Sequence, residues 1–240
     1  MTDTLRSCMV AEEGFTFIAL DASQIELRIV AHLSQDQAML EDLKTGDLHM
    51  ATAIRMYGWV EDEEEMKQRR YNAKQGNFAD LYEASEFELA NVLGCSEEEA
   101  LAFQEERKRV YPRLYEWKDE MKAKAKEDGY VVSPLGRIRP LPELYGGSWK
   151  MREKAEKLVV NTIAQGMAVD VVKMAGLYLR RVLSPLVRFV LQVHDEWLLE
   201  VPLDLVEDTI AKCKELAWVF PQYPFDIKLG SVYSHMEEVI

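Results

Sequence analysis

The sequence predicts an α+β fold, in which strands near the two ends of the chain share one sheet and a helical lobe is inserted between them. A short apolar run at residues 15–20 follows a turn-like segment and indicates a buried strand. Two further apolar runs, 187–193 and 197–201, are separated by a short acidic segment, a pattern typical of a β-hairpin. The polar segment 35–128 between these strands has helical spacing, so we expect it to stand away from the sheet.

The remaining elements follow from the same periodicities. Helical spacing begins at Ile25, and one long amphipathic run over 97–126 is ended by Gly129. The Gly- and Pro-rich segment 130–147 predicts an irregular, partly extended connection. The rest of the chain predicts a helix over 149–183 that Gly166 weakens, a helix over 203–218 and a strand over 225–229.

The composition indicates an ordinary globular protein. Its 240 residues, 48% of them hydrophobic, can bury one sizeable core, or one core with a protruding lobe. No stretch approaches the ~18 uninterrupted apolar residues of a membrane span, and the N-terminus lacks the plan of a secretion signal. We therefore expect a cytoplasmic protein without a membrane partner. Cys8, Cys95 and Cys213 are far apart and odd in number, which favours buried, reduced thiols over a disulfide framework or a zinc site.

The charge balance gives no hint of a nucleic-acid partner. A net charge of −13 argues against a protein that grips phosphates through its overall field. Charges farther apart than ~8 to 10 Å are largely screened at ordinary ionic strength, so local basic stripes can still bind phosphates.

Two acids are placed where they could hold a hard cation. Asp21 follows the first strand and Asp195 lies in the hairpin, so rigid backbone would hold both carboxylates at a sheet edge. Magnesium prefers such oxygen ligands, and two ions ~3.5 to 4 Å apart can stabilise an in-line phosphoryl transfer. An isolated acid at a strand end is usually a solvated turn residue, but the adjacent charges of Asp195 and Glu196 are a local cost that a cation relieves. The spacing alone leaves a polymerase, a nuclease and a phosphatase open.

A second group of residues suits a nucleoside triphosphate. Arg70, Lys74, Phe78 and Tyr82 recur every fourth residue and so share one stripe of a helix. Cations can bind phosphates and rings can stack on a base, although an amphipathic surface helix with its aromatic residues facing a core gives the same pattern. Gly76 disfavours this helix by ~1 kcal/mol.

Taken together, these segments resemble the polymerase module of DNA polymerase family A, the DNA polymerase I family. Asp21-Ala22-Ser23-Gln24-Ile25-Glu26-Leu27-Arg28, followed by Ala31-His32-Leu33-Ser34, is similar to motif A of that family. The Arg70 to Tyr82 stripe is similar to motif B, and Gln192-Val193-His194-Asp195-Glu196 is similar to motif C. Other segments fall in the family's order at similar spacing: Asp47-Leu48-His49, Gly129-Tyr130, Leu135-Gly136-Arg137, Asn161, Gln165-Gly166 and Asp170.

The resemblance implies the palm and fingers of a right-hand polymerase. Residues 1–34 and 129–240 would form the palm, an antiparallel sheet with helices, and residues 35–128 the helical fingers. The family's thumb, its upstream primer-gripping motif and any exonuclease domain are absent from this sequence. We therefore expect one piece of a split polymerase, completed by a separate polypeptide.

The resemblance also implies an activity and its residues. The activity is template-directed DNA synthesis from dNTPs on primer-template DNA, with two Mg²⁺ ions that Mn²⁺ can replace, in a bacterium or in a phage-infected bacterial host. The implied catalytic residues are Asp21, Asp195, Glu196 and Lys74; the metal ligands are Asp21, Asp195 and the backbone carbonyl of Ala22. The implied substrate contacts are Glu26, His49, Arg70, Lys74, Phe78 and Tyr82, with Glu26 as a steric gate against ribose and Lys74 as proton donor to pyrophosphate. The implied DNA contacts are Arg28, Arg137, Asn161, Gln165, Gln192 and His194.

Some positions depart from the family pattern. Ala22 stands where an aromatic residue is usual, Glu83 where glycine is usual, and Asp80 where an apolar residue is usual. We expect the added negative charge to disfavour phosphates nearby. A non-catalytic remnant that binds DNA or a partner is therefore an alternative, whereas a nuclease or phosphatase needs neither a sugar gate nor a base-stacking helix.

Overall fold

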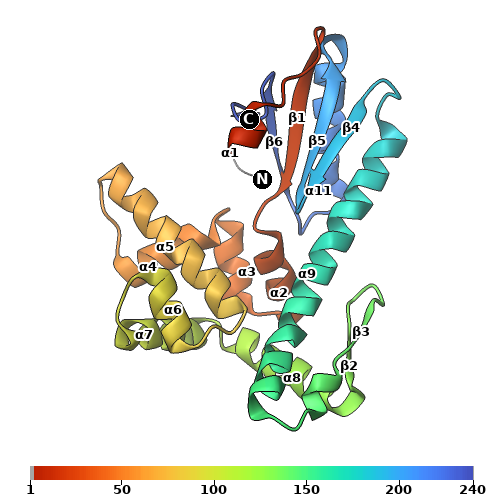
Figure 1. Ribbon diagram of the computed structural model, residues 1–240. Coiled ribbons are helices and arrows are strands. Elements are labelled where there is room, and N and C mark those ends of the chain that lie inside the picture. Colours follow the sequence, from red (N-terminus) through yellow and green to blue (C-terminus); the bar gives the residue numbers. More distant parts are fainter. Residues whose placement is uncertain (1–2, 240) are drawn as a thin grey trace. The chain divides into compact units, whose positions relative to one another are not determined.

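The computed structural model describes residues 3–239 (Figure 1). Its internal contacts divide the chain into two compact units, one of Met1–Ile25 with Met167–Ile240 and one of Glu26–Gly166. We call them the sheet unit and the helical unit. The palm and fingers boundaries at residues 34 and 128 stay a prediction.

The sheet unit contains one antiparallel sheet in the strand order β4-β5-β1-β6-β7. The strands are β1 (Phe15–Ala22), β4 (Arg188–Val193), β5 (Glu196–Pro202), β6 (Phe225–Gly230) and β7 (Glu237–Glu238). The N-terminal strand β1 lies between two strands from the C-terminal part of the chain, as Figure 1 shows. The predicted α+β plan with a shared sheet is confirmed.

Alternate residues of β1 serve the two faces of this sheet. Ile18 and Leu20 pack against Ala175 and Leu179 of the long helix α9 (Trp149–Val182) and against Cys213 of α10 (Val206–Lys214). The predicted helix over 203–218 is wrong as one element. It is divided into a 3₁₀ turn (Leu203–Leu205), α10 and α11 (Leu216–Val219), because the Glu215 N–H donates to Lys212 O, three residues back, and tightens the chain there.

The other face is covered by the two ends of the described chain. Phe17 and Ala19 pack there against Leu198 of β5 and against Tyr233. A short helix α1 (Asp3–Ser7) precedes a bridge between Val10 and Val232, which joins the terminal segments. The acids Asp21 and Glu196 lie farther along this same face.

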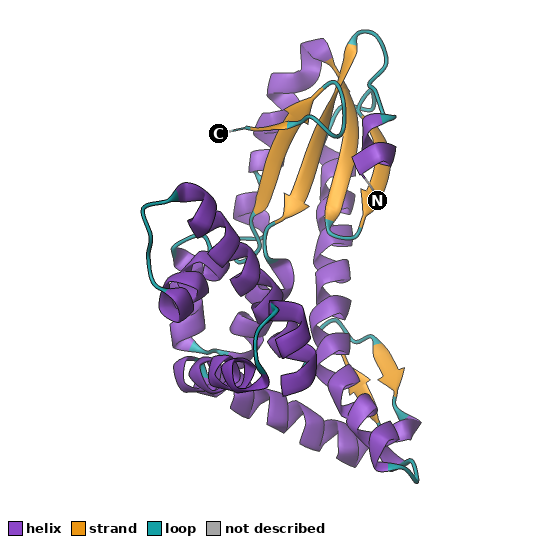
Figure 2. Cartoon of the chain, turned by 60° about the vertical axis from the view of Figure 1, so that its left-hand side comes forward, coloured by secondary structure: helices purple, strands orange, loops and turns teal. Residues whose placement is uncertain are grey.

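The helical unit is built mainly from helices (Figure 2). They are α2 (Ile25–Ser34), α3 (Gln37–Lys44), α4 (Leu48–Tyr57), α5 (Glu63–Leu81), α6 (Glu86–Leu93), α7 (Glu97–Val110) and α8 (Pro112–Asp128), followed by the first part of α9. Aspartate or serine side chains accept backbone N–H groups at the first turns of α3 to α7, which satisfies donors that a helix cannot pair internally. The hairpin of β2 (Tyr130–Val132) and β3 (Ile138–Pro140) and a 3₁₀ turn (Pro142–Tyr145) form the irregular connection that the sequence predicts.

Three local expectations had different outcomes. The run over 97–126 is two helices, because Pro112 lacks an N–H and begins α8. Gly129 ends α8 in the left-handed conformation at φ 78°, as predicted. Cys213 is buried but Cys8 is exposed, so the expectation of buried thiols is wrong for Cys8.

Helix α9 is long and apolar enough to cross a membrane by length and composition alone. Half of its most apolar window is buried inside the protein, and its residues contribute to the cores of both units. Core packing therefore accounts for its composition.

Two helical glycines give a matched test of packing. A Cβ on Gly76 would lie 2.6 Å from Cζ of Phe103, whereas on Gly166 the nearest atom would be Cβ of Ser133 at 3.7 Å. We predict that Gly76→Ala lowers the free energy of unfolding by about 1 to 3 kcal/mol through overpacking. Gly166→Ala should raise it by about 0.5 to 1 kcal/mol through helix propensity. Urea denaturation measures both, and equal effects of the two substitutions would contradict this description of α5 and α7.

Candidate active site

Three carboxylates form a row across one end of the three central strands of the sheet. Asp21 of β1 is paired in register with Glu196 of β5 on one side and with Asp226 of β6 on the other. Directly paired residues of antiparallel strands project on the same face. Asp195 lies in the turn between β4 and β5, and its carbonyl accepts the Ala22 N–H at 3.2 Å. The structure therefore brings together Asp21 and Asp195, as the sequence predicts, and adds Asp226.

This clustering changes the protonation of Asp21. Burial raises the pKa of its carboxyl, and the charges of Asp195, Glu196 and Asp226 raise it further, to about 6. Lys228 opposes the shift with its ammonium 4.0 Å from Oδ2 of Asp21. The carboxylates around Asp21 are thus rich in negative charge, which Lys228 offsets only in part.

Such a site fits a hard divalent cation. Within residues 3–239, no three His, Cys, Asp or Glu side chains are arranged to ligate one ion. Mg²⁺ is usually held by only one or two carboxylates and takes further oxygen ligands from substrate phosphates and water. Asp21 and Asp195 match that requirement.

Glu196 differs from its two neighbours. The residue is buried at 7% exposure, and Oε1 accepts a hydrogen bond from the Tyr233 hydroxyl. Arg6 lies 3.8 Å from the same oxygen. Glu196 is therefore held by protein groups, a property that its place beside Asp195 in the sequence does not reveal.

In the helical unit, the α5 stripe is a helix as predicted, with Tyr82 as its C-cap. Arg70 forms an ion pair with Asp47, the N-cap of α4, while Lys74 is exposed. The Tyr82 hydroxyl donates to Oε2 of Glu26. The stripe thus presents the exposed ammonium of Lys74 and the paired guanidinium of Arg70. At its end, the Tyr82 hydroxyl fixes the carboxylate of Glu26 on α2.

His49 lies beneath this stripe. Its ring is 5.6 Å from that of Phe78 and its side chain is buried, and Nδ1 lies 3.0 Å from Nδ2 of Asn77. Oδ1 of Asn77 accepts from Arg107, so the amide NH₂ must be the group that donates to His49. Burial lowers the pKa of His49 to about 4, and the opposing charge of Asp47 only partly offsets this. His49 is therefore a neutral, buried residue at pH 7.

The expectation that Asp80 adds unfavourable negative charge is corrected by its surroundings. Asp80 is buried, 2.9 Å from Nε of Arg107 and 4.0 Å from Nζ of Lys118, and it accepts the Tyr115 hydroxyl at 2.7 Å. Burial alone would raise its pKa, but Lys118 and Arg107 hold the pKa below its usual value. The Asp80 charge is thus compensated inside the unit.

Glu83 is also compensated, by Lys122 at 2.5 Å. Its backbone has φ 59°, the left-handed region that a glycine adopts without strain. The left-handed backbone therefore explains why glycine is usual at this position. In this chain, Glu83 adopts the same conformation with some backbone strain.

The predicted DNA contacts are distributed over both units. His194 is exposed at the β4–β5 turn with φ 53°, and Gln192 is half-buried on β4. In the helical unit, Arg137 is exposed just before β3, Gln165 is exposed on α9, and Asn161 on α9 and Arg28 on α2 are half-buried.

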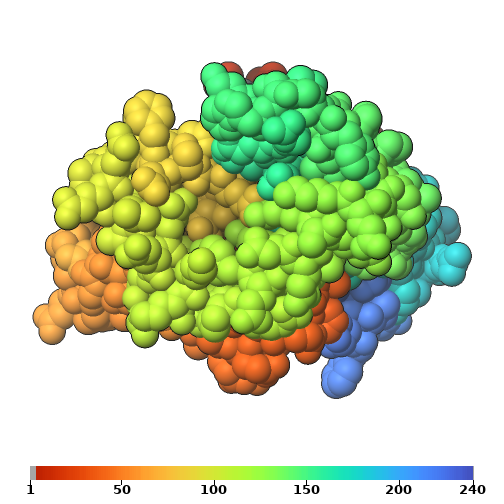
Figure 3. All heavy atoms as spheres, turned by 90° about the horizontal axis from the view of Figure 1, so that it is seen from below, coloured from red at the N-terminus to blue at the C-terminus, as the bar shows by residue number. Residues whose placement is uncertain are grey.

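The helical unit also contains a surface pocket of about 490 Å³ (Figure 3). Its lining comes from the C-terminal end of α5, from α7, α8 and the first part of α9, and includes Asp80, Glu83 and Lys108. None of the predicted substrate contacts lines it, and most of its lysines are already paired with acids. This hollow is therefore distinct from the candidate substrate residues.

Comparison with known proteins identifies related chains. The family model described as DNA polymerase family A matches residues 1–234. The chain is 38% identical over 230 residues to a thermostable DNA polymerase I of Thermus thermophilus, covering 94% of this chain and 28% of that protein. It is 38% identical over 207 residues to DNA polymerase I of Pseudomonas aeruginosa, covering 85% of this chain and 23% of that protein. The chain thus spans less than a third of these relatives.

A solved structure has the same fold. It is the POL domain of Pol1 from M. smegmatis in complex with DNA primer-template and dNTP, with a TM-score of 0.87 and 31% identity. The match covers 97% of this chain and 42% of that chain.

Neutral His49 predicts a specific dependence of stability on pH. The folded-state pKa of about 4 lies below the ordinary 6.5, so the unfolded chain binds the proton more readily and stability falls as pH drops from 6.5 towards 4. We expect about 1 to 2 kcal/mol of this loss by pH 5.

Urea denaturation at pH 7 and pH 5 measures the effect. The His49→Gln variant should lose less stability than the parent between these two pH values. The exposed His194→Gln should behave as the parent does. Equal pH dependence in the parent and the His49→Gln variant would contradict a neutral, buried imidazole.

Proposed function

Since the chain belongs to DNA polymerase family A, we propose that it carries template-directed DNA synthesis, the transfer of a dNTP nucleotidyl group to a primer 3′ end. The observation that carries the proposal is the row of carboxylates around Asp21. Their mutual repulsion and burial are a cost to the folded chain, and a divalent cation with a triphosphate would relieve it.

Asp21 and Asp195 are proposed to hold two Mg²⁺ ions, with the carbonyl of Ala22 as a further ligand; Mn²⁺ would fit the same oxygen donors. When bound, such ions activate the primer hydroxyl and stabilise the leaving oxygen. The protein's contribution is rigidity. Asp21 is fixed by pairing on both sides of β1, and the Ala22 N–H ties the Asp195 turn to the same strand.

Residues of the helical unit are proposed to bind the dNTP. Lys74 is exposed and can donate a proton to the leaving pyrophosphate. The ion pair with Asp47 positions the Arg70 guanidinium before the substrate binds. To bind the dNTP, Arg70 must exchange the Asp47 carboxylate for a phosphate. Phe78 would pack on the sugar and base, and neutral His49 would support that ring from below.

Glu26 is proposed as the gate that excludes a ribose 2′-hydroxyl. The hydrogen bond from Tyr82 supports this role, because it fixes one carboxylate oxygen and with it the side-chain rotamer. A gate must be immobile to exclude a single oxygen atom. Tyr82 therefore has two proposed tasks, which are to position Glu26 and to lie near the templating base.

Primer-template DNA is proposed to contact Arg28, Arg137, Asn161, Gln165, Gln192 and His194. We further propose that polypeptide outside these 240 residues completes the grip on the duplex, as in a split polymerase. The net charge of −13 supports this, since few phosphates can be neutralised by this chain alone.

Primer extension with Mg²⁺ and dNTPs tests the proposed reaction. Asp195→Asn should reduce extension by about 10³-fold or more, because it removes a charged metal ligand from the reacting centre. The exposed Asp204→Asn is a matched control outside the row and should extend as the parent does. Equal extension by the parent and by Asp195→Asn would show that Asp195 has no role in the reaction. Absence of extension in the parent, also with a full-length family A thumb added in trans, would favour a non-catalytic remnant.

The gate is tested by sugar selectivity. Glu26→Ala should raise the incorporation of ribonucleotides relative to deoxyribonucleotides by about 10- to 100-fold, a loss of discrimination of roughly 1.4 to 2.7 kcal/mol. Tyr82→Phe keeps the ring and frees Glu26, so a smaller rise in the same direction is expected. Unchanged selectivity in Glu26→Ala would contradict the gate.

A further inference from the structure

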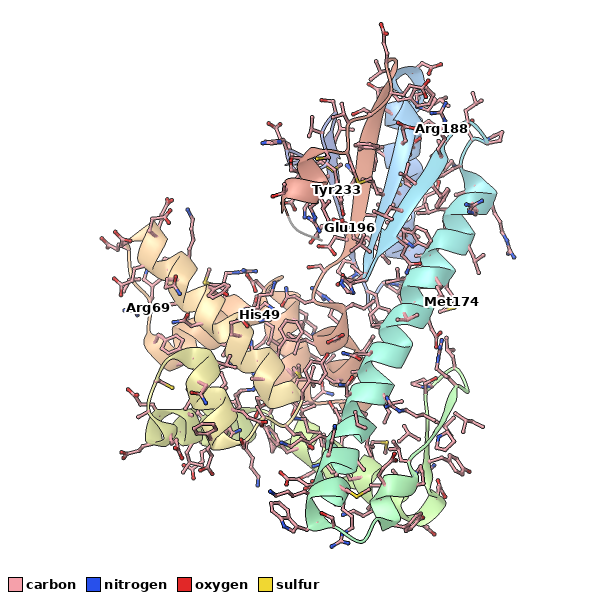
Figure 4. The ribbon with its side chains drawn as sticks, in the orientation of Figure 1. His49, Arg69, Met174, Arg188, Glu196 and Tyr233 are labelled. Carbon is pink, nitrogen blue, oxygen red and sulfur yellow. The ribbon has the colours of Figure 1, made fainter. Side chains whose placement is uncertain are left out.

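A small cluster on the sheet unit contacts the Glu196 carboxylate. The Tyr233 hydroxyl donates to Oε1 of Glu196, and the two side chains lie together beside α1 and β1 in Figure 4. The Arg6 guanidinium lies 3.8 Å from the same oxygen and 4.7 Å from the centre of the Tyr233 ring. The carboxylate therefore faces a phenol and a cation from two separate segments.

Those two segments are fixed to each other by the backbone. Val10 and Val232 form a bridge, the Tyr233 N–H donates to Met9 O at 3.1 Å, and the Ala11 N–H donates to Ser231 O at 2.9 Å. The Tyr233 ring is buried with Phe17 and Leu198 on the face of the sheet that carries the acids. Arg6 and Tyr233 are thus presented to Glu196 by packed structure.

Glu196 has a place from which it could compete for metal. It follows Asp195 directly and is the register partner of Asp21. Its side chain is one methylene longer than that of either aspartate, so a small rotation would bring its oxygens towards any ion bound between them.

We propose that Tyr233 and Arg6 are positioning residues that hold the Glu196 carboxylate aside, so that Asp21 and Asp195 alone supply carboxylate ligands to the metal ions. This inference rests on the proposed function of the two aspartates. Glu196 then acts as a fixed negative charge beside the site, and the number of ligands at the ions stays low enough for substrate phosphates to bind.

The physical reason lies in the cost of a buried carboxylate that loses one of its two partners. Without the Tyr233 hydroxyl, Oε1 of Glu196 loses a hydrogen bond in a site that is 7% exposed. A bound cation nearby is the strongest partner that it can reach by rotation. Removal of the hydroxyl should therefore recruit Glu196 as an additional ligand.

The test is a titration of the whole chain with Mn²⁺, in which electron paramagnetic resonance measures the concentration of unbound Mn²⁺. Tyr233→Phe should tighten Mn²⁺ binding by about 3- to 10-fold, and this gain should disappear in the double variant Tyr233→Phe/Glu196→Gln. Glu196→Gln alone should weaken binding only about 2-fold, as expected for a charge that is near the ion but not bound to it.

Matched variants separate this effect from a loss of structure. Tyr178→Phe removes another tyrosine–glutamate hydrogen bond of the sheet unit, 2.8 Å to Glu215, and should leave Mn²⁺ affinity unchanged. Arg6→Met removes the other group that contacts Glu196, so it should also tighten Mn²⁺ binding, as Tyr233→Phe does.

Unchanged or weakened Mn²⁺ binding in both Tyr233→Phe and Arg6→Met overturns the inference, as does a gain that persists when Glu196 is replaced. Asp195→Asn separates this failure from failure of the proposed function. If Asp195→Asn binds Mn²⁺ as the parent does, the aspartates are not the ligands, and the proposed function is contradicted instead.

Discussion

The position of β1 between β5 and β6 is the constraint on which the candidate site depends. A central strand buries its apolar residues on both faces, and Ile18 and Leu20 on one face with Phe17 and Ala19 on the other fix its register. Once the register is fixed, Asp21 cannot avoid Glu196 and Asp226, because pairing places them on the same face. The repulsion is therefore imposed by hydrophobic packing several residues away.

The protein treats its buried charges in two opposite ways. In the helical unit, Asp80 is matched by Arg107 and Lys118, so the charges stabilise one another within a fixed network. In the sheet unit, Asp21 is partly exposed, and Lys228 at 4.0 Å is its one ion-pair partner within residues 3–239. A charge left with little compensation in a rigid setting is the usual mark of a site that is completed by a ligand.

Much of this could be predicted from the sequence. Periodicity gave the α+β plan, the hairpin that carries Asp195 and the helix that carries Arg70 to Tyr82, because these depend on local apolar spacing. The break at Pro112 was missed, although proline favours the first turn of a helix and so offered a signal for it.

The partners of the site residues could not be predicted in this way. Tyr233, Arg107 and Asp226 act through contacts between segments far apart in the chain, and no local spacing encodes these contacts. Asp80 is the clearest case, because it looks like an added charge on a substrate helix, and only its tertiary neighbours show that it is neutralised. The left-handed backbone at Glu83 explains why the family usually has glycine at this position. That conformation can be seen in the structure but not in the sequence.

The most direct measurement compares the stability of the metal-free chain and its Asp21→Asn variant, with and without Mg²⁺. A carboxyl whose pKa is raised to about 6 makes the folded state less stable at pH 7. Asparagine should therefore raise the free energy of unfolding by about 1 kcal/mol, after allowance for the partial exposure of the site. Mg²⁺ should stabilise the parent and not the variant. A destabilised Asp21→Asn chain, together with no effect of Mg²⁺ on the parent, would contradict a site built for metal.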